Sequence, residues 1–402
     1  MNLPNDPQRE WAVEVVRRLK AAGHAALWAG GCVRDVLLGR TPKDYDVATD
    51  ATPDQVLALF GRRRSLAIGA AFGVVAVRGT KAQGMVEVAT FRQDAVYSDG
   101  RHPDHVTFST PEQDAQRRDF TINGLFFDPL AETVLDFVGG KQDLRDGVVR
   151  AIGNPADRIG EDKLRMLRAV RFAAAFEFRL EAATQAAVSA HAPQIRVVSG
   201  ERIAEELRRI LTHESRVRGI SLLRQCGLLA QTLPELATAQ VDEQAWQQMQ
   251  AVLAGLTSPT FPMALAALLR CAVPTSEKDR PWARRLRLSN DEADRTAFLL
   301  AAEDDVRRAC DRPWPHVQRL LISPGGAELV RFGEAVASAL GDDPRHLAFC
   351  REKLALPPEQ LNPLPLLTGD DLVAAGLPPG VIYRTILTAV RDAQLLGQIA
   401  SR

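Results

Sequence analysis

The stretch GGCVRDVLLGRTPKDYDVAT, residues 30–49, places two aspartates, Asp44 and Asp46, one residue apart behind a pair of glycines. Tyr45 and Val47 favour a β-strand, and successive side chains on a strand point to opposite faces. Both carboxylates are therefore predicted to project from the same face. Two carboxylates a few Å apart repel each other unless a cation lies between them. Mg²⁺ is usually held by one or two carboxylates together with substrate phosphates, so this stretch predicts a magnesium site.

The residues upstream of the aspartates are suited to a triphosphate. Gly30 and Gly31 allow backbone N–H groups to approach phosphate oxygens closely, and the guanidinium of Arg34 can pair with those oxygens. An Asp-x-Asp sequence alone is more often a turn or a solvated strand, and a Gly-Gly pair alone is more often a loop. Their combination with Arg34 indicates metal-assisted phosphoryl chemistry on a nucleotide.

A second cluster of charged residues is RRDFTINGL, residues 117–125. Arg118 is suited to bidentate contact with phosphate, and Asn123 can form hydrogen bonds with a sugar or a backbone group. An ion pair between Arg118 and Asp119 on the surface is the structural alternative. A further carboxylate, Glu87 in VEVATFR, lies on a predicted neighbouring strand, where both a metal-binding and a structural role are open.

A third cluster is EDKLRMLRAVRF, residues 161–172, which predicts one helix. Residues three or four apart share a helix face. The charged residues on or beside that face are Glu161, Asp162, Arg165, Arg168 and Arg171. A solvated face of ion pairs is the structural alternative. An Asp beside an Arg, however, presents the acceptors and donors that match the Watson–Crick edge of a base, so this helix predicts a nucleobase site made of protein.

The composition is that of an ordinary globular chain. Of 402 residues, 46% are hydrophobic, and 50 Lys and Arg balance 50 Asp and Glu. A nucleic-acid partner would therefore need a local basic surface. The five cysteines lack CxxC spacing, which argues against a disulfide framework and against a zinc site. The same dispersed, odd set of cysteines makes a reducing cytoplasm the expected location. We find no apolar run long enough for a membrane span and no signal-peptide pattern.

The order of elements predicts an α+β protein. Strands and helices alternate over residues 1–150, with a long loop at 93–116, and nearly all the chain after residue 159 is helical. Thr52 predicts the N-cap of a helix that runs through Phe60, with Pro53 in its first turn. Ser199 to Leu211 predicts an amphipathic helix with Ile203, Leu207, Ile210 and Leu211 inward, whose charges serve packing and solvation. We predict four parts, namely a mixed-sheet catalytic head (1–150), a helical neck with the base-reading helix (151–230), a helical body (231–340) and a helical tail (341–402).

These blocks, in this order, resemble the class II nucleotidyltransferases of the tRNA nucleotidyltransferase (CCA-adding enzyme) and bacterial poly(A) polymerase family. The resemblance covers roughly residues 25–225 strongly and extends weakly to LPLLTGDDLVAAGLPPG near the C-terminus. It implies a five-stranded mixed-sheet head followed by helices. It also implies nucleotide addition to an RNA 3′ end, with ATP and CTP as substrates and tRNA bound by the tail. No membrane and no obligate protein partner are implied.

The resemblance also implies roles for individual residues. Asp44 and Asp46 would bind two Mg²⁺ ions, with Glu87 as a further candidate ligand. Asp162 and Arg165 would read the incoming base, with Glu161 orienting them. The remaining residues expected to bind the nucleotide are Gly30, Gly31, Arg34, Arg118, Asp119, Asn123, Arg168 and Arg171. Residues 141–150 resemble a hinge between head and neck, and the loop at 93–116 resembles the one that helps to switch specificity from C to A.

The chain departs from the family pattern in two places. Gly124 follows Asn123 where Ala is common. Arg270 and Cys271 stand where some relatives have the His-Asp pair of a phosphohydrolase, so we expect a degenerate body without that activity. CCA addition to tRNA is the predicted reaction. Alternatives are an A-adding enzyme, a poly(A) polymerase and, from another class, a non-catalytic RNA-binding protein. Residues 341–402 hold six Lys and Arg against seven Asp and Glu, a poor electrostatic match to the long RNA of a poly(A) polymerase.

Overall fold

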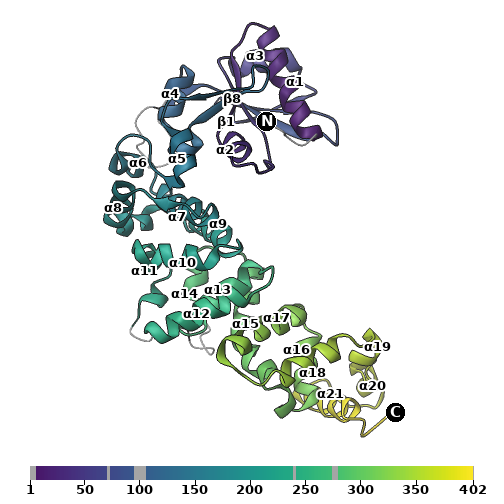
Figure 1. Ribbon diagram of the computed structural model, residues 1–402. Coiled ribbons are helices and arrows are strands. Elements are labelled where there is room, and N and C mark those ends of the chain that lie inside the picture. Colours follow the sequence, from purple (N-terminus) through teal and green to yellow (C-terminus); the bar gives the residue numbers. More distant parts are fainter. Residues whose placement is uncertain (1–5, 70–72, 95–105, 239–240, 274–278, 402) are drawn as a thin grey trace. The chain divides into compact units, whose positions relative to one another are not determined.

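The computed structural model describes residues 6–69, 73–94, 106–238, 241–273 and 279–401. The chain divides into two compact units, whose elements are labelled in Figure 1. The first comprises Met1–Glu206 and Ser221–Thr232, and the second comprises Leu207–Ile220 and Leu233–Arg402. The first unit thus holds the whole predicted head and most of the predicted neck, and the four-part division stays a finer prediction.

A mixed β-sheet forms the core of the first unit. Its strands are β1 Ala26–Ala29, β2 Asp46–Thr49, β3 Ser65–Gly69, β4 Val74–Arg78, β5 Met85–Thr90, β8 Leu125–Asp128 and β9 Thr133–Asp136. The order is β3-β4-β5-β2-β1-β8-β9, with β2 and β5 parallel and all other neighbours antiparallel. The mixed sheet is confirmed. The expected count of five strands is wrong, because the described sheet has seven strands, with β3 and β9 at its edges.

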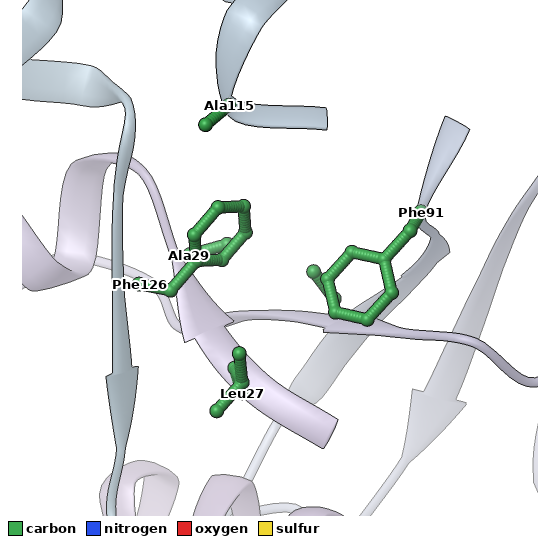
Figure 2. Close-up of a cluster of buried hydrophobic side chains, with 6 residues drawn as sticks. Leu27, Ala29, Phe91, Ala115 and Phe126 are labelled. Carbon is green, nitrogen blue, oxygen red and sulfur yellow. The ribbon is translucent and has the colours of Figure 1, made fainter. Parts of the chain in front are cut away.

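One face of this sheet carries a cluster of small and aromatic side chains (Figure 2). Leu27 pairs with Ala48 across β1 and β2, and Ala29 pairs with Phe126 across β1 and β8. The small alanines leave room for Phe126 to meet Phe91 edge to face, with ring centroids 5.8 Å apart.

Helix α1 (Pro7–Ala21) covers the opposite face. It packs against β1, β2 and β5, and its Trp11 donates an indole hydrogen bond to the Val77 carbonyl at 3.3 Å. Tyr45 lies within electrostatic range of Asp6 and Arg9 at the start of the helix, which identifies the face that α1 occupies. The face of Asp44 and Asp46 is therefore left uncovered by this helix.

Two short helices follow strands of the sheet. Helix α2 (Gly31–Leu37) follows β1 directly, and α3 (Pro53–Phe60) follows β2. Thr52 caps α3 as predicted, because its side chain accepts from the backbone of Gln55 while the Gln55 side chain accepts from the Thr52 backbone.

The segment 93–116 differs from the predicted loop. Strands β6 (Arg92–Asp94) and β7 (Val106–Phe108) pair antiparallel, and α4 (Pro111–Gln116) begins with a capping box at Thr110. Polar composition concealed these short elements, since they are specified by pairing and capping rather than by hydrophobic periodicity. Residues 95–105, where the specificity loop was expected, lie outside the described residues.

The rest of the first unit is mostly helical but not entirely so. Its whole helices are α5 Gly140–Asp146, α6 Pro155–Glu161, α7 Arg165–Ala175, α8 Ala182–His191 and α11 Leu228–Thr232. Helices α9 Gly200–Leu211 and α10 Arg216–Gln225 each have residues in both units. Strands β10 (Val148–Val149) and β11 (Arg179–Leu180) pair in parallel. The predicted neck was helical throughout, so strand β11 is a departure from that prediction. The inward residues predicted for α9, Ile203, Leu207, Ile210 and Leu211, are buried.

The second unit is helical in its described part. Its further helices are α12 Glu243–Gly255, α13 Phe261–Leu269, α14 Pro281–Arg285, α15 Asn290–Arg307, α16 Trp314–Leu321, α17 Gly326–Leu340, α18 Arg345–Leu354, α19 Pro358–Leu361, α20 Gly369–Ala374 and α21 Val381–Leu395. Helix α13 is buried on nearly every side and packs against α12, α15 and α17. Among the described residues, no helix has the length and apolarity required to cross a bilayer.

Candidate active site

The two aspartates lie at the start of strand β2. Asp46 is its first residue, and Asp44 precedes it. Both side chains are exposed, whereas Tyr45 is 1% exposed and packs on Trp28 with ring centroids 4.8 Å apart. The alternation expected from the sequence thus brings both carboxylates to the face opposite α1.

Negative charge accumulates around Asp46. Glu87 of β5 is the direct cross-strand partner of Asp46. The pKa of Asp46 is raised to about 6. Loss of solvent around the carboxylate is the largest cause, the negative charges of Asp44 and Glu87 add to it, and the positive charge of Arg118 opposes it. A divalent cation would relieve this repulsion, and hard carboxylate oxygens are the ligands that Mg²⁺ prefers.

The donor set fits a cation that is shared with substrate. Within the described ranges, no three His, Cys, Asp or Glu side chains lie close enough together to hold a metal. A cation at Asp44 and Asp46 would therefore complete its coordination with water or phosphate oxygens, as Mg²⁺ commonly does. Glu87 acts on Asp46 through its charge in this structure.

Asp46 lines an open pocket of about 390 Å³ formed by the first unit. The predicted site residues that line it are Gly30, Gly31, Arg34, Asp46, Arg118, Asp119, Asn123, Asp162, Arg165 and Arg168. Arg92, Arg117 and Phe172 complete the lining. Six arginines face three aspartates, so the pocket is suited to a polyanion. Asp44, Glu87, Glu161 and Arg171 were also predicted for the site but do not line this pocket.

Gly30 shapes the floor of the pocket. Its φ of +71° is a conformation that residues with a Cβ rarely adopt. A Cβ at this position would also lie 2.8 Å from Nη1 of Arg118. The absence of a side chain therefore allows Arg118 to cross the start of α2.

Asp119 is the buried centre of the site. Its Oδ2 accepts from Nε and Nη2 of Arg168 at 2.8 and 2.6 Å. Its Oδ1 accepts from the Asn123 amide at 3.0 Å and from the Phe120 backbone at 2.8 Å. Although burial disfavours the charge, Arg168, the Asn123 hydrogen bond and Arg165 hold the pKa of Asp119 at about 2. Its oxygens are engaged by protein, so Asp119 orients other residues.

The predicted helix over residues 161–172 is broken. Helix α6 ends at Glu161, Asp162 is extended with φ −144° and ψ 108°, and α7 begins at Arg165. Arg165 bonds to Glu161, whereas Asp162 accepts from Arg202 of α9 at 2.7 Å and from the Leu164 backbone at 3.0 Å. The expectation that Glu161 orients both residues is therefore wrong for Asp162, whose partner is Arg202.

Several side chains that hold the site were missed from the sequence. Buried Asp114 of α4 bonds to Arg117 at 2.8 Å and to Arg118 at 2.9 Å. Glu206 of α9 bonds to Arg171 at 2.7 Å. The charges of α9 thus serve the site as well as solvation. In the sequence, the one signal for these pairs is that acidic residues occur near arginine-rich stretches. Which acid pairs with which arginine is decided by the fold.

Replacing Asp119 by Asn should destabilise the fold. Breaking a buried ion pair typically costs about 3–5 kcal/mol, so we expect the free energy of unfolding at pH 7 to fall by about 3 kcal/mol. The folded pKa of about 2 lies below that of an unfolded aspartate. The stabilisation is therefore fully present above pH ~4 and is lost as pH falls toward ~2. Urea unfolding of both proteins across this range should show the difference between their unfolding free energies narrowing as pH falls. Exposed Asp157→Asn should change neither the stability at pH 7 nor its dependence on pH.

Replacing Gly30 by Ala should strain the backbone and displace Arg118. We expect a stability loss of about 1–3 kcal/mol and roughly tenfold weaker binding of a triphosphate, the effect of losing about one charge-assisted contact. Gly23→Ala is the matched control, since Gly23 has φ +87° with nothing within 4 Å of the added Cβ. Equal triphosphate affinity in both variants would contradict the role of Gly30.

Comparison with known proteins agrees with this site. A family model described as "Poly A polymerase head domain" matches residues 26–150. A second, described as "Probable RNA and SrmB- binding site of polymerase A", matches residues 177–240. Both matched segments contribute to the first unit.

Two curated relatives and one solved structure place the chain in a family. The CCA-adding enzyme of Geobacillus kaustophilus is 34% identical over 98% of this chain and 94% of its own length. Poly(A) polymerase I of Haemophilus influenzae is 36% identical over 63% of this chain and 58% of its own length. The crystal structure of the Bacillus stearothermophilus CCA-adding enzyme in complex with CTP has a TM-score of 0.79 and 28% identity, covering 99% of this chain and 95% of that one. The chain therefore belongs to the nucleotidyltransferase family that comprises the CCA-adding enzymes and the bacterial poly(A) polymerases.

Proposed function

We propose that this nucleotidyltransferase adds C, C and A from CTP and ATP to the 3′ end of tRNA, without a nucleic-acid template and with release of pyrophosphate. One observation carries the proposal. Asp46, the arginines and the pair Asp162 and Arg165 line the same pocket of about 390 Å³. Groups for metal, phosphate and base therefore lie within the reach of a single nucleotide.

The aspartate pair supplies the metal site in this proposal. Asp44 and Asp46 would hold two Mg²⁺ ions, which when bound activate the attacking 3′-hydroxyl and neutralise the charge on the triphosphate and the leaving pyrophosphate. Arg34 and Arg118 bind phosphate oxygens beside them. Arg168 is occupied by Asp119, so its main task is to orient that carboxylate while its positive charge still faces the pocket.

Asp162 and Arg165 read the base in this proposal. Cytosine and adenine both carry an exocyclic amino group, which uracil lacks, and a carboxylate can accept from it. Asp162 has acceptor capacity beyond its bonds to Arg202 and Leu164, and Arg165 supplies N–H donors to ring acceptors. One rigid Asp-Arg pair can therefore favour both C and A.

The extent of similarity favours a CCA-adding enzyme over a poly(A) polymerase. The CCA-adding relative aligns with nearly the whole chain, whereas the match to the polymerase covers 63% of it. The nearly neutral residues 341–402 lack the excess of basic residues that a long polyanion favours. An A-adding enzyme is the second candidate, because it would need the same pocket. A cytoplasmic location stays a prediction.

The proposal predicts the products of one assay. The purified protein with Mg²⁺ is given tRNA transcripts ending before CCA, after C and after CC, each with CTP, ATP or both. With both nucleotides we expect three, two and one additions, respectively, that stop at CCA. A single A added only to the CC-ended transcript would identify an A-adding enzyme. Long A tails would identify a poly(A) polymerase. Asp46→Ala should abolish incorporation, and activity equal to the unmodified protein would contradict the catalytic role of the pair.

Arg202 should control base selection through Asp162. Arg202→Gln removes the 2.7 Å bond that fixes one Asp162 oxygen. We expect kcat/KM for CTP and ATP to fall roughly tenfold to a hundredfold, with a smaller preference over UTP, because a loosened carboxylate discriminates less well. Single-nucleotide incorporation measures this ratio. Arg179→Gln, at an exposed arginine of β11 outside the pocket, should leave it unchanged.

A further inference from the structure

Two aromatic rings near the end of α7 lie beneath four arginines of the first unit; Phe172 is on the helix and Phe176 is its C-cap residue. Phe172 and Phe176 are one turn apart and stack with ring centroids 6.0 Å apart and planes 11° apart. The guanidiniums over these rings are those of Arg34, Arg40, Arg168 and Arg171. An aromatic ring attracts a cation through its quadrupole without carrying a charge of its own. The rings therefore hold arginines in place and leave their positive charge available.

Arg34 is the arginine most enclosed by this arrangement. It is 8% exposed. Its Nε donates to Asp35 at 2.8 Å, its Nη2 lies 2.7 Å from the same oxygen, and its Nη1 donates to Asn123 at 2.7 Å. A guanidinium has five N–H groups. Contacts with the residues that the structure describes use three of them, which leaves two for a ligand in the pocket that Arg34 lines.

The polar partners hold Arg34 only at its edges. Hydrogen bonds in the guanidinium plane leave rotation out of that plane weakly restrained. Phe176 supplies the missing contact, with the guanidinium carbon 4.5 Å from its ring centroid, compared with 5.3 Å for Phe172. Of the two rings, Phe176 is thus the nearer to the guanidinium carbon of Arg34.

We propose that Phe176 is a positioning residue for nucleotide binding, whose ring orients Arg34 so that its two remaining N–H groups face the triphosphate. This rests on the nucleotide-binding part of the proposed function. Phe176 does not line the pocket, whereas Phe172 does. Any effect of Phe176 on a nucleotide must therefore pass through another residue. Its ring contacts two pocket residues, Arg34 and Phe172, and Arg34 is the one that carries N–H groups for phosphate oxygens.

Phe176→Leu keeps apolar bulk and removes the ring. We expect CTP to bind roughly tenfold more weakly in calorimetric titration, equivalent to about 1.4 kcal/mol. KM should rise equally for CTP and ATP, with kcat within about twofold, because Arg34 holds the triphosphate in both the ground and transition states. KM for tRNA should not change. Phe176→Tyr keeps an aromatic face and should restore CTP binding.

A structural role alone would give a different result. It would lower the melting temperature and the active fraction while leaving the KM of the folded protein unchanged, and that result would overturn the proposal. Phe137→Leu is the matched control, since Phe137 is a partly buried ring that packs on Phe126 in the same unit. If Phe176→Leu fails to fold, Phe176→Met fills a similar volume without a ring and should show the same tenfold loss.

A double-mutant cycle tests the route through Arg34. In an Arg34→Ala background, Phe176→Leu should weaken CTP binding by less than twofold. If the full effect persists there but disappears with Arg40→Ala, the ring acts through Arg40 and the proposal is wrong. CTP affinity is measured without RNA, so a failure of CCA addition leaves this test intact, and an unchanged CTP affinity refutes the positioning role alone.

Discussion

The ion pair between Asp119 and Arg168 is the constraint on which the site depends. It joins the segment before β8 to helix α7, 49 residues further along the chain. From Asp119 the hydrogen bonds continue through Asn123 to Arg34 of α2. Because a buried carboxylate is costly unless each oxygen is satisfied, this chain of contacts has few alternatives. The three segments that supply the proposed phosphate-binding and base-reading groups are thereby fixed relative to one another within the first unit.

Local patterns predicted the parts of the site that local structure determines. Alternation placed Asp44 and Asp46 on one face because Tyr45 and Trp28 fill the other. The cap at Thr52 and the buried stripe of α9 followed from capping and helical periodicity. In each case the residues that decide the outcome lie within a few positions of one another.

Long-range partners decided what the sequence did not predict. Helical periodicity over 161–172 is real, yet Asp162 is extended because its carboxylate bonds to the Leu164 backbone and to Arg202, 40 residues away. Asp114 could not be recognised as an arginine partner before α4 was known to turn it inward. The strand count likewise depended on pairing at the sheet edges.

The meeting of distant motifs at one edge follows from strand order. Strand β1 lies between β2 and β8 and is antiparallel to both, so the end of β1 is adjacent to the starts of β2 and β8. Gly30 follows β1, and its N–H donates to the Leu125 carbonyl at 3.0 Å. Asp46 begins β2, and RRDFTIN directly precedes β8. The pairing of Trp28 with Val47 sets the face of Asp46. A shift of one residue would turn both carboxylates toward α1. The packing of Trp28 and Tyr45 on the α1 face therefore keeps the two aspartates on the opposite face.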